Sequence, residues 1–465
     1  MEREKNADLS QGSVGKLLLR LALPTITAQL VNALYNIVDR IYIGHIPVVG
    51  KTALTGVGVC LSLIMIISAF AALTAMGGAT RASIMLGRGD RQTAEKILGN
   101  CTTGAVLVSV VLTALFLAFN RPLLLTFGAS PDTIGYAVEY MNIYALGTIF
   151  VELALGLNAF ITAQGFAGVS MVSVIIGAVC NIILDTVFIQ VLHLGVSGAA
   201  LATIISQALS AAWVVRFLLG KRTGLRIRRE NLRINWRVYC PCLALGLSPF
   251  IMQSTEGVIA VCFNATLQKF GGDLAVGAMT ILSSVMQFSM LPLQGLTQGA
   301  QPIISYNFGA RNPDRVRKAF ALLLGISLGY SLLLWSLAML CPGALAAVFA
   351  TDEALIAYSA WAMRIYMAVA LIFGAQIACQ QTFIALGNAK VSLFLAVLRK
   401  ILLLIPLIFL LPMFFHTGEE KAMAVFLAEP VADFLAVITT VVTFTLLFRR
   451  TLRRLRDPEP EGVAR

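Results

Sequence analysis

The chain has 465 residues, of which 58% are hydrophobic and only 12% are charged, and its formal net charge is +12. This composition excludes an ordinary soluble globular protein, in which about a quarter of the residues are charged. The sequence contains no metal-ligand spacing, no phosphate-binding GxxxxGK[ST] loop and no nucleophile–base set. We therefore expect neither an enzyme nor a cofactor, and a nucleotide-hydrolysing pump within this chain is excluded.

Apolar runs recur along nearly the whole chain, each of about 20 residues and long enough to cross a hydrocarbon layer of roughly 30 Å as a helix. In chain order they lie near residues 17–43, 53–76, 97–119, 135–158, 168–190, 196–218, 240–264, 274–300, 319–341, 355–380, 391–413 and 422–447. Segments such as Ile401 to Leu411 do not alternate apolar and polar residues, as membrane β-strands would. The prediction is an all-α integral membrane protein with about twelve spans.

Basic residues gather in one set of alternate loops. This set includes the run from Lys221 to Arg237 and the tail from Arg449 to Arg456. The opposite loops hold only Lys51, Arg121, Lys269 and Lys421. By the positive-inside rule both termini are expected in the cytoplasm. Topology therefore explains the basic surface, with attraction to membrane lipids as a secondary effect, and we expect no nucleic-acid partner.

The second half of the chain repeats the first. The stretch from Pro24 to Asp39 returns as Pro249 to Asn264, and the turn Gly87-Arg88-Gly89-Asp90 returns as Gly309-Ala310-Arg311-Asn312. The offset is close to half the chain length each time. Such repeats form pseudosymmetric pairs in membrane transporters.

A long arginine-rich loop, residues 220–237, separates the two copies. We therefore expect two six-helix lobes, residues 1–227 and 228–465. Because six is an even number, both lobes should have the same orientation, with N- and C-termini in the cytoplasm.

The first span carries a stripe of polar residues. Gln29, Asn32, Asn36 and Asp39 follow one another at helical spacing, so they share one face. The span ends near Gly44, which places Asp39 about 8 Å from its outer end at 1.5 Å per residue. Ionisable groups at such depth are costly, and they usually face the protein interior and have a function.

Two more spans bring polar groups to a similar depth. Asp185 on the fifth span and Thr203 on the sixth are each expected about 12 Å from the outer end, and Asn181 lies one turn deeper than Asp185 on the same face. Carboxylates with amide and hydroxyl oxygens suit a small cation. Two carboxylates in one low-dielectric site also suit the uptake and release of a proton. The alternative is a structural cluster of interhelical hydrogen bonds.

In the second half of the repeat the corresponding positions are uncharged: Asn264 corresponds to Asp39, and Pro406 corresponds to Asp185. Glu256 lies mid-span on the seventh helix and is a candidate for contacting a cationic substrate. Arg399 and Lys400 are expected to extend their long side chains to the membrane surface.

Four other acidic residues and one arginine lie within or near the predicted spans. We expect Arg364 to pair with an acidic residue and Glu139 to be solvated near an interface, whereas the roles of Glu152, Glu429 and Asp433 stay open.

Gln, Asn and Met side chains are expected to line a substrate cavity, because flexible Met accommodates varied lipophilic ligands. The candidate cavity residues are Gln29, Asn32, Gln253, Glu256, Met286, Gln287 and Met290. All of these types are also ordinary helix-packing residues.

At these positions the chain resembles bacterial multidrug and toxic compound extrusion (MATE) transporters. The matching segments are Asn36 to Gly44, Asn181 to Asp185, Gly195 to Thr203, Gln298 to Pro302 and Asn307 to Ala310. The resemblance covers nearly the whole chain and implies twelve helices in two lobes.

The resemblance also implies functional residues. It implies a coupling-ion site at Asp39, Asn181, Asp185 and Thr203, to which the stripe adds Asn36. Glu256 matches a helix-seven glutamate of the sodium-coupled subgroup. That subgroup's acidic residue on helix ten has no counterpart, because that span carries Arg364, Gln376, Gln380 and Gln381 instead.

Together these features predict a secondary active antiporter that exports lipophilic, mostly cationic compounds in exchange for inward H+ or Na+. Na+, if it is the coupling ion, would bind at Asp39 and Asp185, and Pro24 would act as a hinge in the first helix. The alternatives are a lipid-linked saccharide flippase of the same superfamily and a channel. We expect a multi-pass monomer in a bacterial inner membrane.

Overall fold

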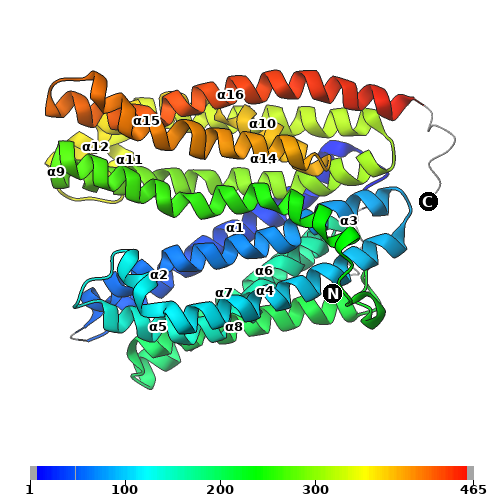
Figure 1. The fold of residues 1–465 in the computed structure, drawn as a ribbon, viewed down its shortest axis with the longest axis horizontal. Helices are drawn as coiled ribbons and strands as arrows, with labels where there is room; N and C mark the ends of the chain where they lie inside the picture. The colour runs from blue at the N-terminus through cyan, green and yellow to red at the C-terminus, as the bar shows by residue number, and fades with distance from the viewer. Residues whose placement is uncertain (1–7, 48, 458–465) are drawn as a thin grey trace. The chain divides into compact units, whose positions relative to one another are not determined.

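The computed structural model describes residues 8–47 and 49–457, and these residues form helices joined by short loops, with no strand among them (Figure 1). The predicted cytoplasmic ends, residues 1–7 and 458–465, lie outside this range. The helices of the first half are α1 (Val14–Gly44), α2 (Gly50–Ala71), η1 (Ala72–Met76), α3 (Gly77–Gly87), α4 (Arg91–Thr126), α5 (Ile134–Leu146), α6 (Thr148–Ala163), α7 (Ala167–Asp185), η2 (Thr186–Val191), α8 (Gly195–Leu219) and η3 (Arg229–Asn231). Those of the second half are α9 (Trp236–Gly309), α10 (Pro313–Leu340), α11 (Pro342–Ala347), α12 (Glu353–Tyr366), α13 (Ala370–Ala385), α14 (Ala389–Val397), η4 (Leu398–Leu404), α15 (Ile405–Leu410), η5 (Leu411–Phe414) and α16 (Gly418–Arg456).

The helices are long and apolar enough to cross a membrane. In the described part of the chain there are nine such helices, or eleven spans when the bent pairs α5–α6 and α12–α13 each count as one. The 74-residue α9 is two helices joined at Gly272, where the backbone turns to a positive φ of 64°. Counting those two separately gives the twelve spans that the sequence predicts.

The chain forms two compact units. Of the described residues, unit 1 holds residue 8 and residues 20–85 and 90–254, and unit 2 holds residues 9–19, 86–89 and 255–457. In unit 1, α8 packs against α5, α6 and α7, and in unit 2, α16 packs against α12 and α13. The predicted lobe boundary after residue 227 stays a prediction.

The repeat is visible in the local geometry. The bends of α5–α6 (57°) and α12–α13 (53°) fall at corresponding positions. Asp90 and Asn312 both begin a helix, because their side chains accept the backbone N–H groups of Thr93 (2.9 Å) and Arg315 (3.2 Å). The expected turns before α4 and α10 are therefore confirmed. A further pair of matching turns uses glycine at positive φ, at Gly165 and Gly387, before α7 and α14.

Each unit has its own apolar core. The core of unit 1 gathers side chains from α2, α4, α5 and α8, including Ile67 and Phe116, and the core of unit 2 gathers those of α9, α12 and α16, including Phe263 and Phe426. Small residues allow close helix contacts, as at Gly246, where a Cβ atom would lie 2.1 Å from a carbonyl oxygen of η1.

Candidate functional site

Two aspartates meet in unit 1. Asp39 lies on α1, and Asp185 is the last residue of α7, where the helix widens into the π-helical turn η2. Their carboxyl groups are close enough to hydrogen-bond to each other when one carries a proton. The hydroxyl groups of Tyr42 and Thr186, 2.8 Å apart, join α1 to η2 directly beside this pair. π-turns of this kind are frequent at functional sites.

The oxygens of this site lack hydrogen-bond donors. Among the described residues, Asp39 Oδ1, Asn181 Oδ1 and both carboxylate oxygens of Asp185 are buried and accept no hydrogen bond. Asp185 is fully buried and Asn181 is 1% exposed. Ionised carboxylates can only accept, so four buried oxygens without a donor form a site that favours a proton or a small cation.

An amide pocket adjoins the carboxyl pair. Asn181 Nδ2 donates to Thr203 Oγ1 at 3.5 Å, and Thr203 Oγ1 donates to Ala199 O at 3.0 Å. Asn32, Asn181 and Thr203 line the same small cavity of about 40 Å³ between α1, α6, α7 and α8. That volume accommodates a water molecule or a small ion but no drug.

Two tyrosines complete the surroundings of the pair, and sequence reasoning did not find them. Tyr140 on α5 is 3% exposed, and α5 packs against α8, which carries Thr203. Tyr35 on α1 lines the same small cavity as Asn32, Asn181 and Thr203. No sequence pattern separates these tyrosines from ordinary core aromatics, because the fold alone brings them next to the aspartates.

The remaining predicted residues of α1 lie outside the carboxyl pair. Asn36 is exposed, and its Nδ2 donates to Asn32 O on its own helix at 2.6 Å. Gln29 is partly exposed. Pro24 lies inside a helix that continues through it, shortly after α1 passes from unit 2 to unit 1 between Leu19 and Arg20.

Unit 2 contains a cluster of five charged side chains, of which Arg399, Lys400, Glu429 and Asp433 are buried and Glu256 is half-exposed. Arg399 Nε contacts Asp433 Oδ1 at 2.6 Å, and Arg399 Nη2 contacts Glu429 Oε1 at 3.1 Å. Lys400 Nζ contacts Glu256 Oε1 at 2.8 Å. The guanidinium also lies 4.6 Å from the ring centroid of Phe373.

The expectation that Arg399 and Lys400 reach the membrane surface is wrong, because both side chains are buried and paired inside unit 2. They lie on the π-helical η4, whose wider turn projects consecutive residues to different partners. Glu429 and Asp433 lie four residues apart within one span, and two acids on one helix face need a cation nearby within the membrane. This spacing was the sequence feature that could have predicted the buried ion pairs.

The candidate cavity residues of α9 have mixed environments. Glu256 is half-exposed and carries the ion pair with Lys400. Met286 packs against the core of unit 2, whereas Gln287 is exposed and Met290 and Gln253 are partly exposed. Their role in a substrate cavity stays a prediction.

Three other acidic or basic residues have defined positions. Arg364 is exposed and donates from Nε to Met339 O at 3.2 Å, so the predicted acidic partner is wrong. Glu139, expected to be merely solvated, accepts a hydrogen bond from the Ser197 hydroxyl. Glu152 is fully buried, with Thr74 Oγ1 at 3.4 Å as its donor.

The repeated helical units, the broken helices and the buried carboxyl pair define a multi-pass membrane transporter. Residues 24–187 and 250–410 match the MatE family. The chain belongs to this family of multidrug efflux transporters.

Individual relatives agree over nearly the full length. The chain is 25% identical to the multidrug export protein MepA of Staphylococcus haemolyticus, over 97% of this chain and 98% of the relative. It is 34% identical to the MATE multidrug transporter DinF-BH, solved in complex with a small molecule, with a TM-score of 0.87 over 97% and 99% of the two chains. A MATE structure in the bent conformation shares the fold, with a TM-score of 0.90, 21% identity, and 97% and 99% of the two chains covered. Together with the spans, these bacterial relatives identify a multi-pass bacterial membrane protein.

Proposed function

We propose that this transporter is a secondary active antiporter, which exports lipophilic, mostly cationic small molecules in exchange for inward H+ or Na+. The observation that carries the proposal is the group of four buried oxygens on Asp39, Asn181 and Asp185 without a donor. A site of this kind is most stable when a proton or cation occupies it, and its charge changes when the ion leaves.

The substrate class is supported by the relatives. MepA is named a multidrug export protein, and DinF-BH, named a multidrug transporter, was solved with a small molecule bound. Glu256 contributes a half-exposed carboxylate that can attract a positively charged compound. In this proposal a cationic substrate competes with the Lys400 ammonium for that carboxylate.

The geometry supports a coupling mechanism by alternating access of the two halves. Ion binding neutralises the carboxyl pair at the junction of α1 and η2, and this changes the packing of α1, with Pro24 as the hinge. Release of the ion to the cytoplasm restores the charge. An inward-moving unit charge supplies about 2.3 kcal/mol per 100 mV, which can support export against a gradient.

The test measures efflux of a fluorescent lipophilic cation from proteoliposomes under a pH gradient or a Na+ gradient, each imposed alone. Asp39→Asn and Asp185→Asn should each lose gradient-driven transport by at least tenfold. Asp132→Asn, an exposed residue of the same unit, is the control and should transport normally.

Each outcome has a defined meaning. Loss in both site variants under one gradient only would support the proposal and identify the ion. Full gradient-driven transport after both aspartates are replaced together would refute the coupling site. No uphill transport by the wild type under either gradient would favour the flippase or the channel.

A further inference from the structure

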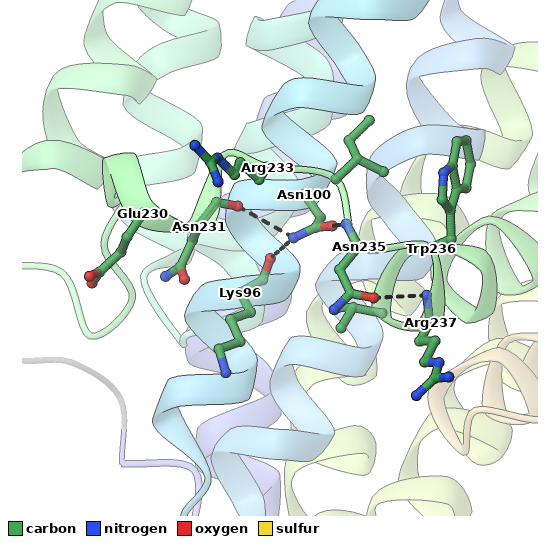
Figure 2. A pocket seen from close by; sticks show the side chains of 10 residues that line it. Lys96, Asn100, Glu230, Asn231, Arg233, Asn235, Trp236 and Arg237 are labelled. Carbon is green, nitrogen blue, oxygen red and sulfur yellow. Dashed lines mark hydrogen bonds between the residues drawn. The ribbon is translucent and has the colours of Figure 1, made fainter.

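A second polar cavity lies at the cytoplasmic end of unit 1, where the linker between α8 and α9 crosses α4 (Figure 2). It has a volume of about 640 Å³, and all its lining residues belong to unit 1. Its charged side chains are Lys96, Arg233, Arg237 and Glu230. The cavity has no part in the coupling site described above.

The linker is held on α4 by specific contacts. The buried Asn100 donates from Nδ2 to Lys96 O (2.8 Å) and Asn231 O (3.3 Å), and its Oδ1 accepts the backbone N–H of Asn235 at 2.6 Å (Figure 2). Thr103 Oγ1 donates to a linker carbonyl at 2.6 Å. The shape of the cavity is therefore set by the fold, because both of its walls are hydrogen-bonded together.

Gly99 explains how the linker comes so close to α4. A Cβ atom at this position would lie 2.4 Å from the carbonyl oxygen of Asn231, so any larger residue would push the linker away. This contact and the Asn100 hydrogen bonds fix the linker to two consecutive residues of α4, and the Thr103 hydrogen bond fixes it one turn further on.

The cavity carries an excess of positive charge. Lys96, Arg233 and Arg237 are exposed and have no carboxylate partner among the described residues. The single acid, Glu230, faces Arg228 at 3.7 Å. In Figure 2 Lys96 and Arg237 extend the same way, on either side of Asn235, whereas Arg233 extends in the opposite direction. Three cations around neutral amides form a site for an anion with several acceptor oxygens, such as a phosphate group.

The position of the cavity indicates where that phosphate comes from. The linker joins two membrane-spanning helices on the side with the most basic loops, which places it at the cytoplasmic surface. Trp236, the first residue of α9, is 63% exposed beside the cavity. Exposed indole rings are typical of the headgroup region of a membrane, where one side is apolar and the other is wet.

We propose that this cavity binds the phosphate headgroup of an anionic phospholipid from the cytoplasmic leaflet. Lys96 and Arg237 contact the phosphate, Arg233 adds positive charge to the same cavity, and Trp236 packs against the glycerol and upper acyl region. Basic cavities at the cytoplasmic ends of membrane helices are suited to such headgroups.

The test uses the purified full-length protein in a neutral detergent, and native mass spectrometry measures the binding of added phosphatidylglycerol. Phosphatidylcholine serves as the zwitterionic comparison. The cavity variant combines Lys96→Gln, Arg233→Gln and Arg237→Gln. A matched control removes three exposed charges of the same linker outside the cavity, with Lys221→Gln, Arg222→Gln and Arg229→Gln.

Each cation is expected to contribute about a fivefold preference for an anionic lipid, so the cavity variant should bind phosphatidylglycerol about 100-fold more weakly. The control triple variant should change binding only a few-fold, and both variants should keep the wild-type unfolding temperature because the replaced side chains are exposed. Trp236→Gln should also weaken lipid binding, although it removes no charge.

Three results would overturn the proposal. Equal weakening in both triple variants would mean a diffuse attraction to the basic linker. Unchanged binding in the cavity variant would mean that the lipid binds elsewhere. Displacement of the lipid by excess inorganic phosphate, with Trp236→Gln behaving as wild type, would identify a soluble phosphate compound as the ligand.

Discussion

Removing the Arg399 guanidinium should destabilise unit 2 strongly. Its Nε lies 2.6 Å from Asp433 Oδ1, and its Nη2 lies 3.1 Å from Glu429 Oε1. The side chains of Asp433 and Glu429 are 7% and 5% exposed. In Arg399→Met both carboxylates stay buried without this partner. Breaking a buried ion pair by removing one side costs about 3–5 kcal/mol. The methionine keeps most of the apolar stem, so the expected loss comes mainly from charge.

The loss can be measured by thermal unfolding in detergent with a thiol-reactive dye. Cys379 in unit 2 is buried, as are Cys60, Cys101 and Cys242 in unit 1, so their labelling reports the opening of each unit. At roughly 2–4 °C per kcal/mol for a domain of this size, the unfolding temperature should fall by about 6–20 °C.

Two further variants make the result decisive. Arg364→Met removes an exposed arginine of the same unit, whose Nε donates to the carbonyl oxygen of Met339, and should change stability by less than about 1 kcal/mol. Adding Glu429→Gln and Asp433→Asn to Arg399→Met should recover much of the loss, because no buried charge is then left unpaired. Equal stability of Arg399→Met and Arg364→Met would refute the buried-charge reasoning. Failure of the triple variant to recover would assign the loss to packing, including the contact with Phe373.

Two other predictions follow from the same structure. Lys400→Met removes the intramolecular competitor for Glu256 and should tighten equilibrium binding of a fluorescent lipophilic cation roughly fivefold. The control, Lys390→Met, removes an exposed lysine of α14 and should leave binding unchanged. Weaker binding in Lys400→Met would contradict the proposed competition. Gly246→Ala should destabilise by about 1–3 kcal/mol, because its Cβ would meet the backbone of η1, whereas Gly257→Ala on the same helix has open space and should be neutral or slightly stabilising. Thermal unfolding of both glycine variants checks this, and equal effects would show that the close helix contact is unimportant.

The sequence was sufficient to predict the fold class. Apolar length determines the number of spans, because the hydrocarbon thickness and the helical rise leave little freedom. The repeat was equally readable, since turn residues such as Asp90 and Asn312 act locally on the helix that follows them. The first-half polar residues could be grouped because helical periodicity and depth in the span both follow from residue number.

The charges of unit 2 show why the sequence does not predict contacts between side chains of different helices. Nothing near Lys400 in the sequence indicates Glu256, which lies on a helix more than a hundred residues earlier. The same is true of Tyr35 and Thr203, which line one cavity although they lie on α1 and α8. A long basic side chain within a span can extend to the surface or pair inside, and only the positions of neighbouring helices decide between them.

By itself, the sequence determined the properties that depend on length, period and local turn chemistry: the helical spans, the duplicated halves and the turns that begin α4 and α10. The orientation of the loops and the depth of Asp39 and Asp185 in the membrane stay predictions. Only the tertiary structure decided which polar groups meet. It left four oxygens of the aspartate site without donors, while it surrounded Arg399 with acceptors. The physical reason is that burial and pairing of charge depend on contacts between helices, and these contacts are set by packing over the whole unit.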